Sequence, residues 1–321
     1  MAKRRYDAAV MHDFFVDRLV HTRDLPRLFE LAWRKWKRGG GSIHDIAEED
    51  VSGGNAVNLA HALGTLGAKV LIVTHSDEEH RPQLQKAFRG LKVEARVKPL
   101  PAGLTVSFEE RVNVMVSYSG GAAKFSPALL TEGDWRALRS SRIVCSANWA
   151  ANDQGTELLV ALRENLGERA TVHLGTADVT DREARYRKLV DLMKRKRLAD
   201  WLSVNEFEAG ATARALGLSP GTTKKMCGMI SRELGIMVDL HTEYSSYTST
   251  DGSVVERKTH HVRPRRLTGA GDVWDAASIF ANLRGMDDGD RLEFANTAAR
   301  LYVQAEPLRP PTLKEVRDAL G

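Results

Sequence analysis

The chain has 321 residues, of which 42% are hydrophobic and 28% are charged, and its formal net charge is +5 at pH 7. It contains no run of about 18 apolar residues, which argues against a membrane-spanning helix, and its two cysteines are too few for a disulfide framework. We therefore expect a cytoplasmic protein with no membrane partner.

Hydrophobic runs of strand length alternate with amphipathic segments of helix length along the chain. Such alternation is typical of a mainly parallel sheet with helices on both faces. The expected strands are 7–16, 69–74, 142–147, 170–174, 200–204 and 235–240. The expected helices are 24–38, 55–67, 81–89, 153–166, 181–197, 206–216, 221–234, 270–284, 288–304 and 312–320. The pattern predicts a single doubly wound α/β domain over residues 1–321.

Residues 92–119 interrupt this rhythm. Polar and apolar side chains alternate over 92–97, 105–108 and 113–118, as in strands with one face in water. Together with the segment near 43–52, these strands are expected to form a small β-sheet that acts as a lid over a cleft. The alternative is that they extend the main sheet.

The basic excess gathers in two short runs, residues 34–38 and 194–197. Each run ends a helical pattern, and cations near a helix C-terminus are stabilised by the helix dipole. We therefore do not expect a nucleic-acid partner, whereas phosphorylated small molecules would suit a basic cleft.

The first expected strand carries Asp13 and Asp17 toward its carboxyl end, where open α/β sheets bind ligands. A glycine pair, Gly53 and Gly54, then precedes the expected helix 55–67. Asn55 and Asn58 lie on one side of its first turn, and their amides both donate and accept hydrogen bonds, which suits sugar hydroxyls. The alternative is a loop whose asparagine only caps the helix.

A second glycine-rich segment, Thr268-Gly269-Ala270-Gly271-Asp272, opens the apolar helix expected over 270–284. A helix N-terminus is a natural anion site, where a carboxylate is out of place unless it takes part in chemistry. A base that accepts the proton of an attacking hydroxyl, beside a cradle for a phosphoryl group, is such chemistry. The alternative is an ordinary glycine turn in which Asp272 only starts the helix. A fourth element is the strand over 202–205, whose polar end leads into a helix through Asn205 and Glu208.

These four elements, in this order, resemble the ribokinase-like (PfkB) family of carbohydrate and nucleoside kinases over roughly residues 6–305. The resemblance implies a ribokinase-like fold with a lid, and it gives the motifs roles. The catalytic residues it implies are the base Asp272 and the anion hole of Gly269, Ala270 and Gly271. The expected substrate ligands are Asp17, Gly53, Gly54, Asn55, Asn58 and Arg111. The expected nucleotide ligands are Asn205, Thr268, Gly269, Gly271 and Asn296. Asn205 and Glu208 are expected to order Mg²⁺ through water.

Three positions depart from the family pattern. His12 stands on the first strand where glycine is usual, and residues 238–244 lack the usual glycine-rich nucleotide loop, so neither ATP nor ADP is favoured as donor. Arg266 replaces an aspartate that helps to hold a monovalent cation in the family, and a guanidinium would repel potassium. Asp275, one turn beyond Asp272, is expected to be a solvated helix residue rather than a partner of the base.

The expected activity is transfer of the terminal phosphoryl group of ATP or ADP to a hydroxyl of a small sugar or sugar phosphate. The segments 103–107, 113–115, 120–127 and 148–150 resemble archaeal members of the family, which makes ribose 1-phosphate the first candidate acceptor. Candidate ligands of its phosphate are His12, Arg18, Arg111 and Lys124. Two alternatives stay open: a nucleoside or unphosphorylated sugar or polyol kinase, and a non-catalytic sugar-sensing protein on the same scaffold. Because the lid often mediates dimer contact in the family, a homodimer through the lid is expected.

Overall fold

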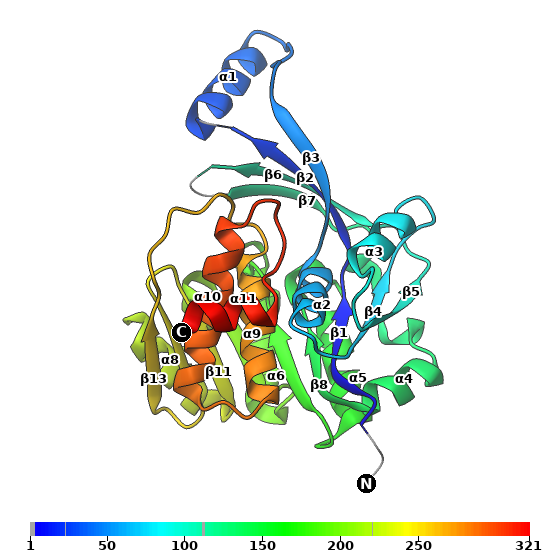
Figure 1. The fold of residues 1–321 in the computed structure, drawn as a ribbon, viewed down its shortest axis with the longest axis vertical. Helices are drawn as coiled ribbons and strands as arrows, with labels where there is room; N and C mark the ends of the chain where they lie inside the picture. Colours follow the sequence, from blue (N-terminus) through cyan, green and yellow to red (C-terminus); the bar gives the residue numbers. More distant parts are fainter. Residues whose placement is uncertain (1–3, 23, 111–112, 220) are drawn as a thin grey trace.

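The computed structural model describes residues 4–22, 24–110, 113–219 and 221–321 (Figure 1). Within these residues, nine strands form the main sheet in the order β13-β12-β11-β10-β9-β8-β1-β4-β5. The strands are β1 (Tyr6–His12), β4 (Val70–His75), β5 (Val93–Lys98), β8 (Ser141–Ser146), β9 (Thr171–Gly175), β10 (Trp201–Asn205), β11 (Met237–His241), β12 (Ser245–Ser249) and β13 (Val254–Lys258). Neighbouring strands from β5 to β11 are parallel, and β12 and β13 are added antiparallel.

Helices cover both faces of this sheet, because its central strands are apolar on both sides. Val10 of β1, for example, is fully buried and pairs with Ile72 of β4 and Cys145 of β8. One face packs against α2 (Asn55–Thr65), α3 (Arg81–Ala87), α9 (Ala270–Leu283), α10 (Asp288–Gln304) and α11 (Leu313–Leu320). The other packs against α4 (Glu132–Arg139), α5 (Gly155–Leu166), α6 (Glu183–Lys196), α7 (Glu206–Ala215) and α8 (Thr223–Leu234). The doubly wound, mainly parallel sheet expected from the sequence is thereby confirmed.

Short 3₁₀ turns complete the helical elements of the main body. They are η1 (Ala122–Lys124), η2 (Pro127–Leu129), η3 (Trp149–Ala151) and η4 (Thr180–Arg182). None of the helices in the described part of the chain is both long and apolar enough to cross a membrane.

A small sheet lies beyond the carboxyl ends of the main strands, and we call it the lid. Its strands are β3 (Ala47–Gly53), β2 (Phe15–His21), β6 (Gly103–Glu109) and β7 (Asn113–Tyr118), in the order β3-β2-β6-β7. Only the central pair, β2 and β6, is parallel. Helix α1 (Leu25–Lys37) follows β2 and lies at the outer end of the lid, away from the main body (Figure 1).

The single strand expected over 7–16 is two strands. β1 ends at His12 in the main sheet, and β2 begins at Phe15 in the lid. Between them, the carboxylate of Asp13 accepts hydrogen bonds from the N–H groups of Asn55 (2.9 Å) and Ala56 (2.8 Å) at the start of α2. This side chain anchors the chain where it leaves the main sheet, and Asp17 therefore belongs to the lid.

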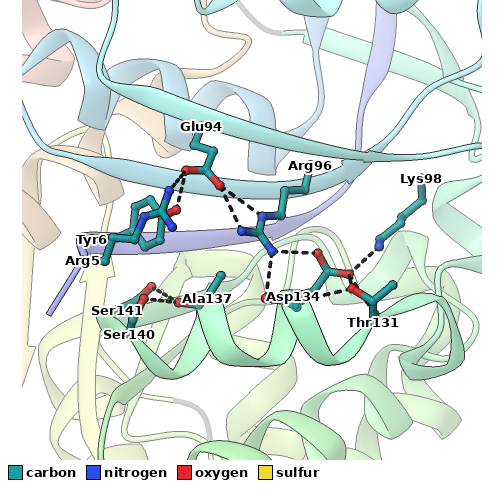
Figure 2. A network of polar contacts seen from close by, with 11 residues as sticks. Arg5, Tyr6, Glu94, Arg96, Lys98, Thr131, Asp134, Ala137, Ser140 and Ser141 are labelled. Carbon is teal, nitrogen blue, oxygen red and sulfur yellow. Dashed lines mark hydrogen bonds and ion pairs between the residues drawn. The ribbon is translucent and has the colours of Figure 1, made fainter. Parts of the chain in front are cut away.

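The expectation that residues 92–119 all belong to the lid is wrong for its first strand. β5 pairs with β4 at the edge of the main sheet, and two of its polar side chains, Arg96 and Lys98, contact residues of α4 (Figure 2). Arg96 donates to Glu94 (3.1 Å) and to the carbonyl of Gly133 (2.8 Å), and Lys98 donates to Asp134 (2.5 Å). Polar alternation therefore marks a charged interface here.

Two further elements were not expected from the sequence. Helix α4 is short and charged, and its start is a capping box in which Thr131 and Asp134 satisfy each other's backbone N–H groups. The β12–β13 hairpin is built mainly from serine, threonine and charged residues, so it lacks the apolar run that identifies a strand. Both elements place only a few apolar side chains in the core, such as Trp135 and Tyr247, so a hydrophobic pattern does not reveal them.

Candidate active site

A cavity of about 620 Å³ lies between the lid, the carboxyl ends of the main strands and the N-termini of α2 and α9. We call it the reaction cleft. Most residues that the sequence singles out line it, from separate parts of the chain. They are Asp17, Gly54, Asn55, Asn58, Asn205, Glu208, Thr268, Gly269, Gly271 and Asp272. The fold therefore brings the four sequence elements to one site.

The loop before α9 has the conformation that its glycines permit. Gly269 has φ +83° in the left-handed region, and a Cβ there would lie 2.6 Å from the hydroxyl oxygen of Tyr302. The same hydroxyl donates to the carbonyl of Thr268 (2.9 Å) and so holds the loop. The N–H of Ala270, expected in the anion hole, instead donates to the carbonyl of Leu267 (3.0 Å), and that of Val273 donates to Gly269 (3.1 Å). The N–H groups of Gly271 and Asp272 are left for an anion.

Asp272 lies in this first turn of α9, held by the two amides from α2. Asn55 Nδ2 donates to Oδ1 (2.8 Å) and Asn58 Nδ2 donates to Oδ2 (2.9 Å). Burial raises the pKa of Asp272 to about 7, against the lowering effect of these hydrogen bonds. A carboxylate with this pKa can both accept and release a proton near neutral pH, as a general base requires.

Asp13 positions the amides that hold Asp272. Besides the N–H groups of Asn55 and Ala56, its carboxylate accepts a hydrogen bond from Asn148 Nδ2 (2.7 Å). Gly54, with φ +94°, allows the close approach, because a Cβ there would lie 3.0 Å from the Asp13 carbonyl oxygen. The negative charge at the start of α2 also matches the helix dipole.

Asp17 enters the reaction cleft from the lid. It fits because Gly53 has no side chain: a Cβ there would lie 1.9 Å from Asp17 Oδ2. Burial raises the pKa of Asp17 to about 7, while a hydrogen bond with Thr105 and the charge of Arg266 oppose the rise. Its oxygens can accept hydrogen bonds from substrate hydroxyls.

Asn205 and Glu208 form the capping box of α7. The side chain of Asn205 accepts from the N–H groups of Phe207 and Glu208 (both 2.9 Å) and donates to Glu208 Oε1 (2.9 Å). Burial raises the pKa of Glu208 to about 7. In the described part of the chain, no three histidine, cysteine, aspartate or glutamate side chains group as a metal site. A water-mediated Mg²⁺ fits these two residues, because Mg²⁺ keeps several waters and needs few protein oxygens.

Thr268 joins the lid to the anion-hole loop, a contact that the sequence did not reveal. Asn113 Nδ2 of β7 donates to Thr268 Oγ1 (2.8 Å), and Ser107 Oγ of β6 lies 3.2 Å from it. Thr268 Oγ1 in turn donates to Glu109 Oε1. The sequence showed only that polar residues lie on strands expected in the lid. It could not show that they contact Thr268, which is 155 or more residues away in the chain.

Other sequence candidates lie elsewhere. Asn296 does not reach the reaction cleft: it is buried in α10, where its Oδ1 accepts from Trp274 Nε1 (2.8 Å). His12 is buried against Phe125, with ring centroids 5.4 Å apart. Arg18 is half exposed and forks onto Asp50 (2.8 and 2.9 Å). Lys124 is exposed, and Arg111 lies outside the described residues.

Asp275 is not the solvated residue that the sequence favoured. It lines the reaction cleft, and Ser203 Oγ donates to its Oδ1. Burial raises the pKa of Asp275 well above its usual value, and the neighbouring charge of Asp272 adds to the rise. The helix periodicity correctly placed Asp275 one turn after Asp272. However, the face of α9 that carries Asp275 is covered by β10, through Ser203.

The altered segment 238–244 forms the end of β11 and the turn into β12. His241 lines the reaction cleft, its ring centroid 4.9 Å from that of Trp274, and burial lowers its pKa to about 4. A neutral, partly buried imidazole therefore lies close to α9, where a Cβ on Gly271 would lie 3.4 Å from its Cε1.

A sequence model of the pfkB family of carbohydrate kinases matches residues 43–314, so the chain belongs to this family. It is therefore a phosphotransferase that acts on an alcohol group of a sugar or nucleoside. No curated protein sequence shows a significant match to the chain.

Solved structures with the same fold include several kinases. A ribokinase from Arabidopsis thaliana complexed with ribose and ATP has 20% identity, 98% coverage of both chains and a TM-score of 0.74. The adenosine kinase from Sinorhizobium meliloti has 17% identity, covers 99% of this chain and 100% of its own, and has a TM-score of 0.80. A nucleoside kinase from Methanocaldococcus jannaschii has 13% identity, 99% coverage of both and a TM-score of 0.72. At these identities the likeness establishes the ribokinase-like fold.

Proposed function

We propose that this kinase transfers the terminal phosphoryl group of ATP or ADP to a hydroxyl of a sugar phosphate, with ribose 1-phosphate as the first candidate acceptor. The observation that carries phosphoryl transfer is Asp272, oriented by Asn55 and Asn58 at the N-terminus of α9. The ribose and ATP bound to the Arabidopsis thaliana ribokinase support the two substrate classes.

In the proposed reaction, Asp272 accepts the proton of the acceptor hydroxyl as that oxygen attacks the terminal phosphorus. The acceptor is oriented by Asp17 on the lid and by the amides of α2. First-turn N–H groups of α9 stabilise the charge on the transferring group, in a site that the lid shields from water. The side chain of Thr268 connects the lid to the loop before α9 through its hydrogen bonds with Asn113 and Glu109.

Asn205 and Glu208 are proposed to orient Mg²⁺ through water at the nucleotide phosphates. When bound, the ion supplies charge neutralisation for the phosphoryl group. With a pKa raised to about 7, the carboxyl of Glu208 is partly ionised near neutral pH, and the ionised form attracts a cation.

A homodimer through the lid is also proposed. The outer faces of β6 and β7 pair Leu104 with Tyr118 and Val106 with Val116. Of these, Val116 and Tyr118 are 64% and 68% exposed. A second copy of the lid would bury this apolar face on the far side of the sheet from the reaction cleft.

A nucleoside or unphosphorylated sugar or polyol kinase is the second candidate, favoured by the shared fold of the Sinorhizobium meliloti adenosine kinase. A screen that crosses ATP and ADP with ribose, ribose 1-phosphate, nucleosides, fructose phosphates and inositol tests both. The highest kcat/KM with ribose 1-phosphate supports the first candidate, and a higher value with a nucleoside or free sugar supports the second. Sugar binding without transfer to any acceptor would instead favour a sugar-sensing protein.

A further inference from the structure

A second cavity, of about 920 Å³, adjoins the reaction cleft. Asp17, Asn58 and Thr268 line both cavities, so they form the boundary between them. The rest of the second cavity is lined by β3, α2, α3 and the segments 265–268 and 302–310. A ligand whose reacting hydroxyl lies at Asp272 can therefore extend past Asp17 and Asn58 into this space.

In the part of the chain that the structure describes, some of the cationic side chains that line the second cavity are not paired with an acidic side chain. Its cationic lining residues are Lys86, Arg89, Arg265, Arg266 and Arg309, and its acidic ones are Asp17, Glu49, Asp50 and Glu306. Arg265 pairs with Glu306, Arg309 with Glu315 outside the cavity, and Asp50 with Arg18. Within the described residues, Lys86 and Arg89 have no ion-pair partner and are exposed on the α3 side of the opening.

Arg266 is the buried cation of this cavity. It is only 7% exposed, its Nε has no hydrogen-bond partner among the described residues, and its nearest carboxylate oxygen, Glu49 Oε1, is 3.9 Å away. A buried guanidinium with an unsatisfied donor is unfavourable unless an anion completes it. Arginine binds phosphate oxygens two at a time through its planar fork.

We infer that the second cavity is the subsite for the phosphate of the acceptor, with Arg266 as its principal ligand and Lys86 and Arg89 at its mouth. This inference rests on the proposed function and names the residues that would make the enzyme specific for a phosphorylated acceptor. The sugar ring spans Asp17 and Asn58, which keeps the acceptor phosphate and the donor phosphates on opposite sides of it. The separation, together with the cations of the subsite, reduces the electrostatic repulsion between the two phosphates.

The acids that face the same cavity restrict how the phosphate binds. Glu49 is shared between Arg266 and His21, whose Nε2 lies 3.3 Å from Glu49 Oε1. Asp17, with its pKa raised to about 7 by burial, is partly neutral at neutral pH, which reduces its repulsion of an anion. Arg266 therefore has weak local competition for its charge and retains donors for a ligand.

The test is a comparison of Arg266→Gln with Arg195→Gln, an exposed arginine of α6 that lines neither cavity. Losing a charge-assisted contact should raise KM for ribose 1-phosphate by roughly 10- to 100-fold. KM for the nucleotide should stay within about twofold, as should KM for free ribose, because neither uses this contact. Arg266→Lys, which keeps the charge but loses the fork, should fall between the two.

The exposed pair Lys86→Gln and Arg89→Gln keeps the inference testable if Arg266→Gln fails to fold. Together they should raise KM for ribose 1-phosphate by several-fold, without changing KM for the nucleotide. Unchanged KM for phosphorylated acceptors in all of these variants, relative to Arg195→Gln, would overturn the inference. So would a wild-type enzyme that phosphorylates only unphosphorylated acceptors, although the kinase function would then stand.

Calorimetry separates failure of the subsite from failure of the proposed function. Ribose 1-phosphate is titrated into the wild type and the variants without nucleotide, with ribose as the comparison ligand. Binding of ribose 1-phosphate that is weakened in Arg266→Gln supports the subsite even if no transfer to that acceptor is found. Equal affinity of the wild type for ribose and ribose 1-phosphate counts against the subsite whatever the activity.

Discussion

At the scale of single residues, the amides of Asn55 and Asn58 give Asp272 both a fixed orientation and a limited pKa. Each carboxylate oxygen receives one amide donor, at 2.8 and 2.9 Å. Without them, burial would push the pKa higher still, and the carboxylate would be protonated at neutral pH. The same residues that suggest a sugar site in the sequence therefore also tune the proposed base.

Asp272→Asn should abolish turnover while leaving nucleotide binding largely intact. The amide keeps the shape of the side chain but cannot accept the proton of the acceptor hydroxyl. Loss of general-base catalysis should lower kcat by about 10²–10⁴-fold. Steady-state kinetics and nucleotide titration measure the two effects separately, and near-normal turnover would remove Asp272 from the mechanism.

The pH dependence of kcat/KM should follow the ionisation of the carboxylates in the reaction cleft. Asp272 acts only when deprotonated, and its pKa is raised to about 7, so activity should rise with pH through about 7. Asn55→Ala removes a hydrogen bond that lowers this pKa, and it should therefore move the rising limb to higher pH. If the rising part of the kcat/KM profile of Asn55→Ala lies at the same pH as in the wild type, the assignment is contradicted. It is also contradicted if kcat/KM falls as the pH is raised through about 7.

The residues of the site could be predicted from sequence where glycine and polar side chains stand beside a helix start, as in 53–58 and 268–272. Residues whose role depends on a distant partner could not. Arg266 was interpreted only in relation to a cation, because nothing in its neighbourhood in sequence reveals the second cavity. Asp275 was expected in solvent, because helix periodicity does not show which strand covers a helix.

At the scale of elements, the lid is tied to the anion-hole loop through one hydroxyl. Thr268 Oγ1 contacts Ser107 and Asn113 and donates to Glu109, so three lid residues meet one loop residue. We therefore expect the position of the lid and the shape of the anion-hole loop to be linked. Such a link favours reaction only when the lid is in contact.

Asn113→Ala should weaken this link and raise KM for the acceptor roughly fivefold, since a lost hydrogen bond costs about 1 kcal/mol. It should also increase nucleotide hydrolysis relative to transfer, because water enters a less tightly closed site. The matched control is Asn165→Ala on α5, whose amide contacts only a carbonyl of its own helix. An unchanged ratio of hydrolysis to transfer would show that the contact does not govern closure.

The charged interface between β5 and α4 should contribute more to stability than a surface ion pair. The Asp134 side chain is only 4% exposed. Burial would raise the pKa of Asp134, but hydrogen bonds from Lys98 and Thr131 outweigh it and lower the pKa to about 2. Lys98→Met removes the nearer of the two cations on this carboxylate and leaves only the longer contact from Arg96 (3.3 Å). It should lower the free energy of unfolding by ~2 kcal/mol.

The control for Lys98→Met is Lys194→Met, which removes an exposed pair with Glu233 and should change the free energy of unfolding much less. Because the folded pKa of Asp134 is depressed, its stabilising effect is present above the unfolded value and is lost as pH falls toward about 2. Urea unfolding at neutral and acid pH measures both. Equal effects of the two substitutions would contradict the role given to this interface.

Element boundaries were predictable where a hydrophobic period is strong, as in α2, α9 and α10. They failed where two strands follow each other through one buried residue pair, as between β1 and β2, and where a strand is mostly polar, as in β12. The strand β5 was located correctly but was assigned to the lid instead of the main sheet. In each failure the deciding interaction is made with a segment far away in sequence. Local pattern therefore assigns the class of fold better than it assigns a strand to a sheet.

At the scale of the whole molecule, the main sheet and the lid contribute different residues to the two cavities. The carboxyl ends of the parallel strands present α2, α7 and α9, whose first turns carry the polar groups of the reaction cleft. The lid adds Asp17 from above, and the second cavity lies where the lid, α3 and the chain around Arg266 meet. Both cavities thus depend on where the lid lies.

Substitution of the outer face of the lid should change the oligomeric state. Val116→Lys puts a charge at the centre of the apolar face formed with Leu104, Val106 and Tyr118, and burying that charge in a dimer interface is strongly unfavourable. Light scattering should therefore report a dimer for the wild type and a monomer for Val116→Lys, whereas Leu320→Lys on the exposed end of α11 should remain a dimer. A wild type that is monomeric at high concentration rules out the lid dimer. If Val116→Lys is monomeric and its KM for the acceptor also rises, the second copy stabilises the lid in the position that completes the site.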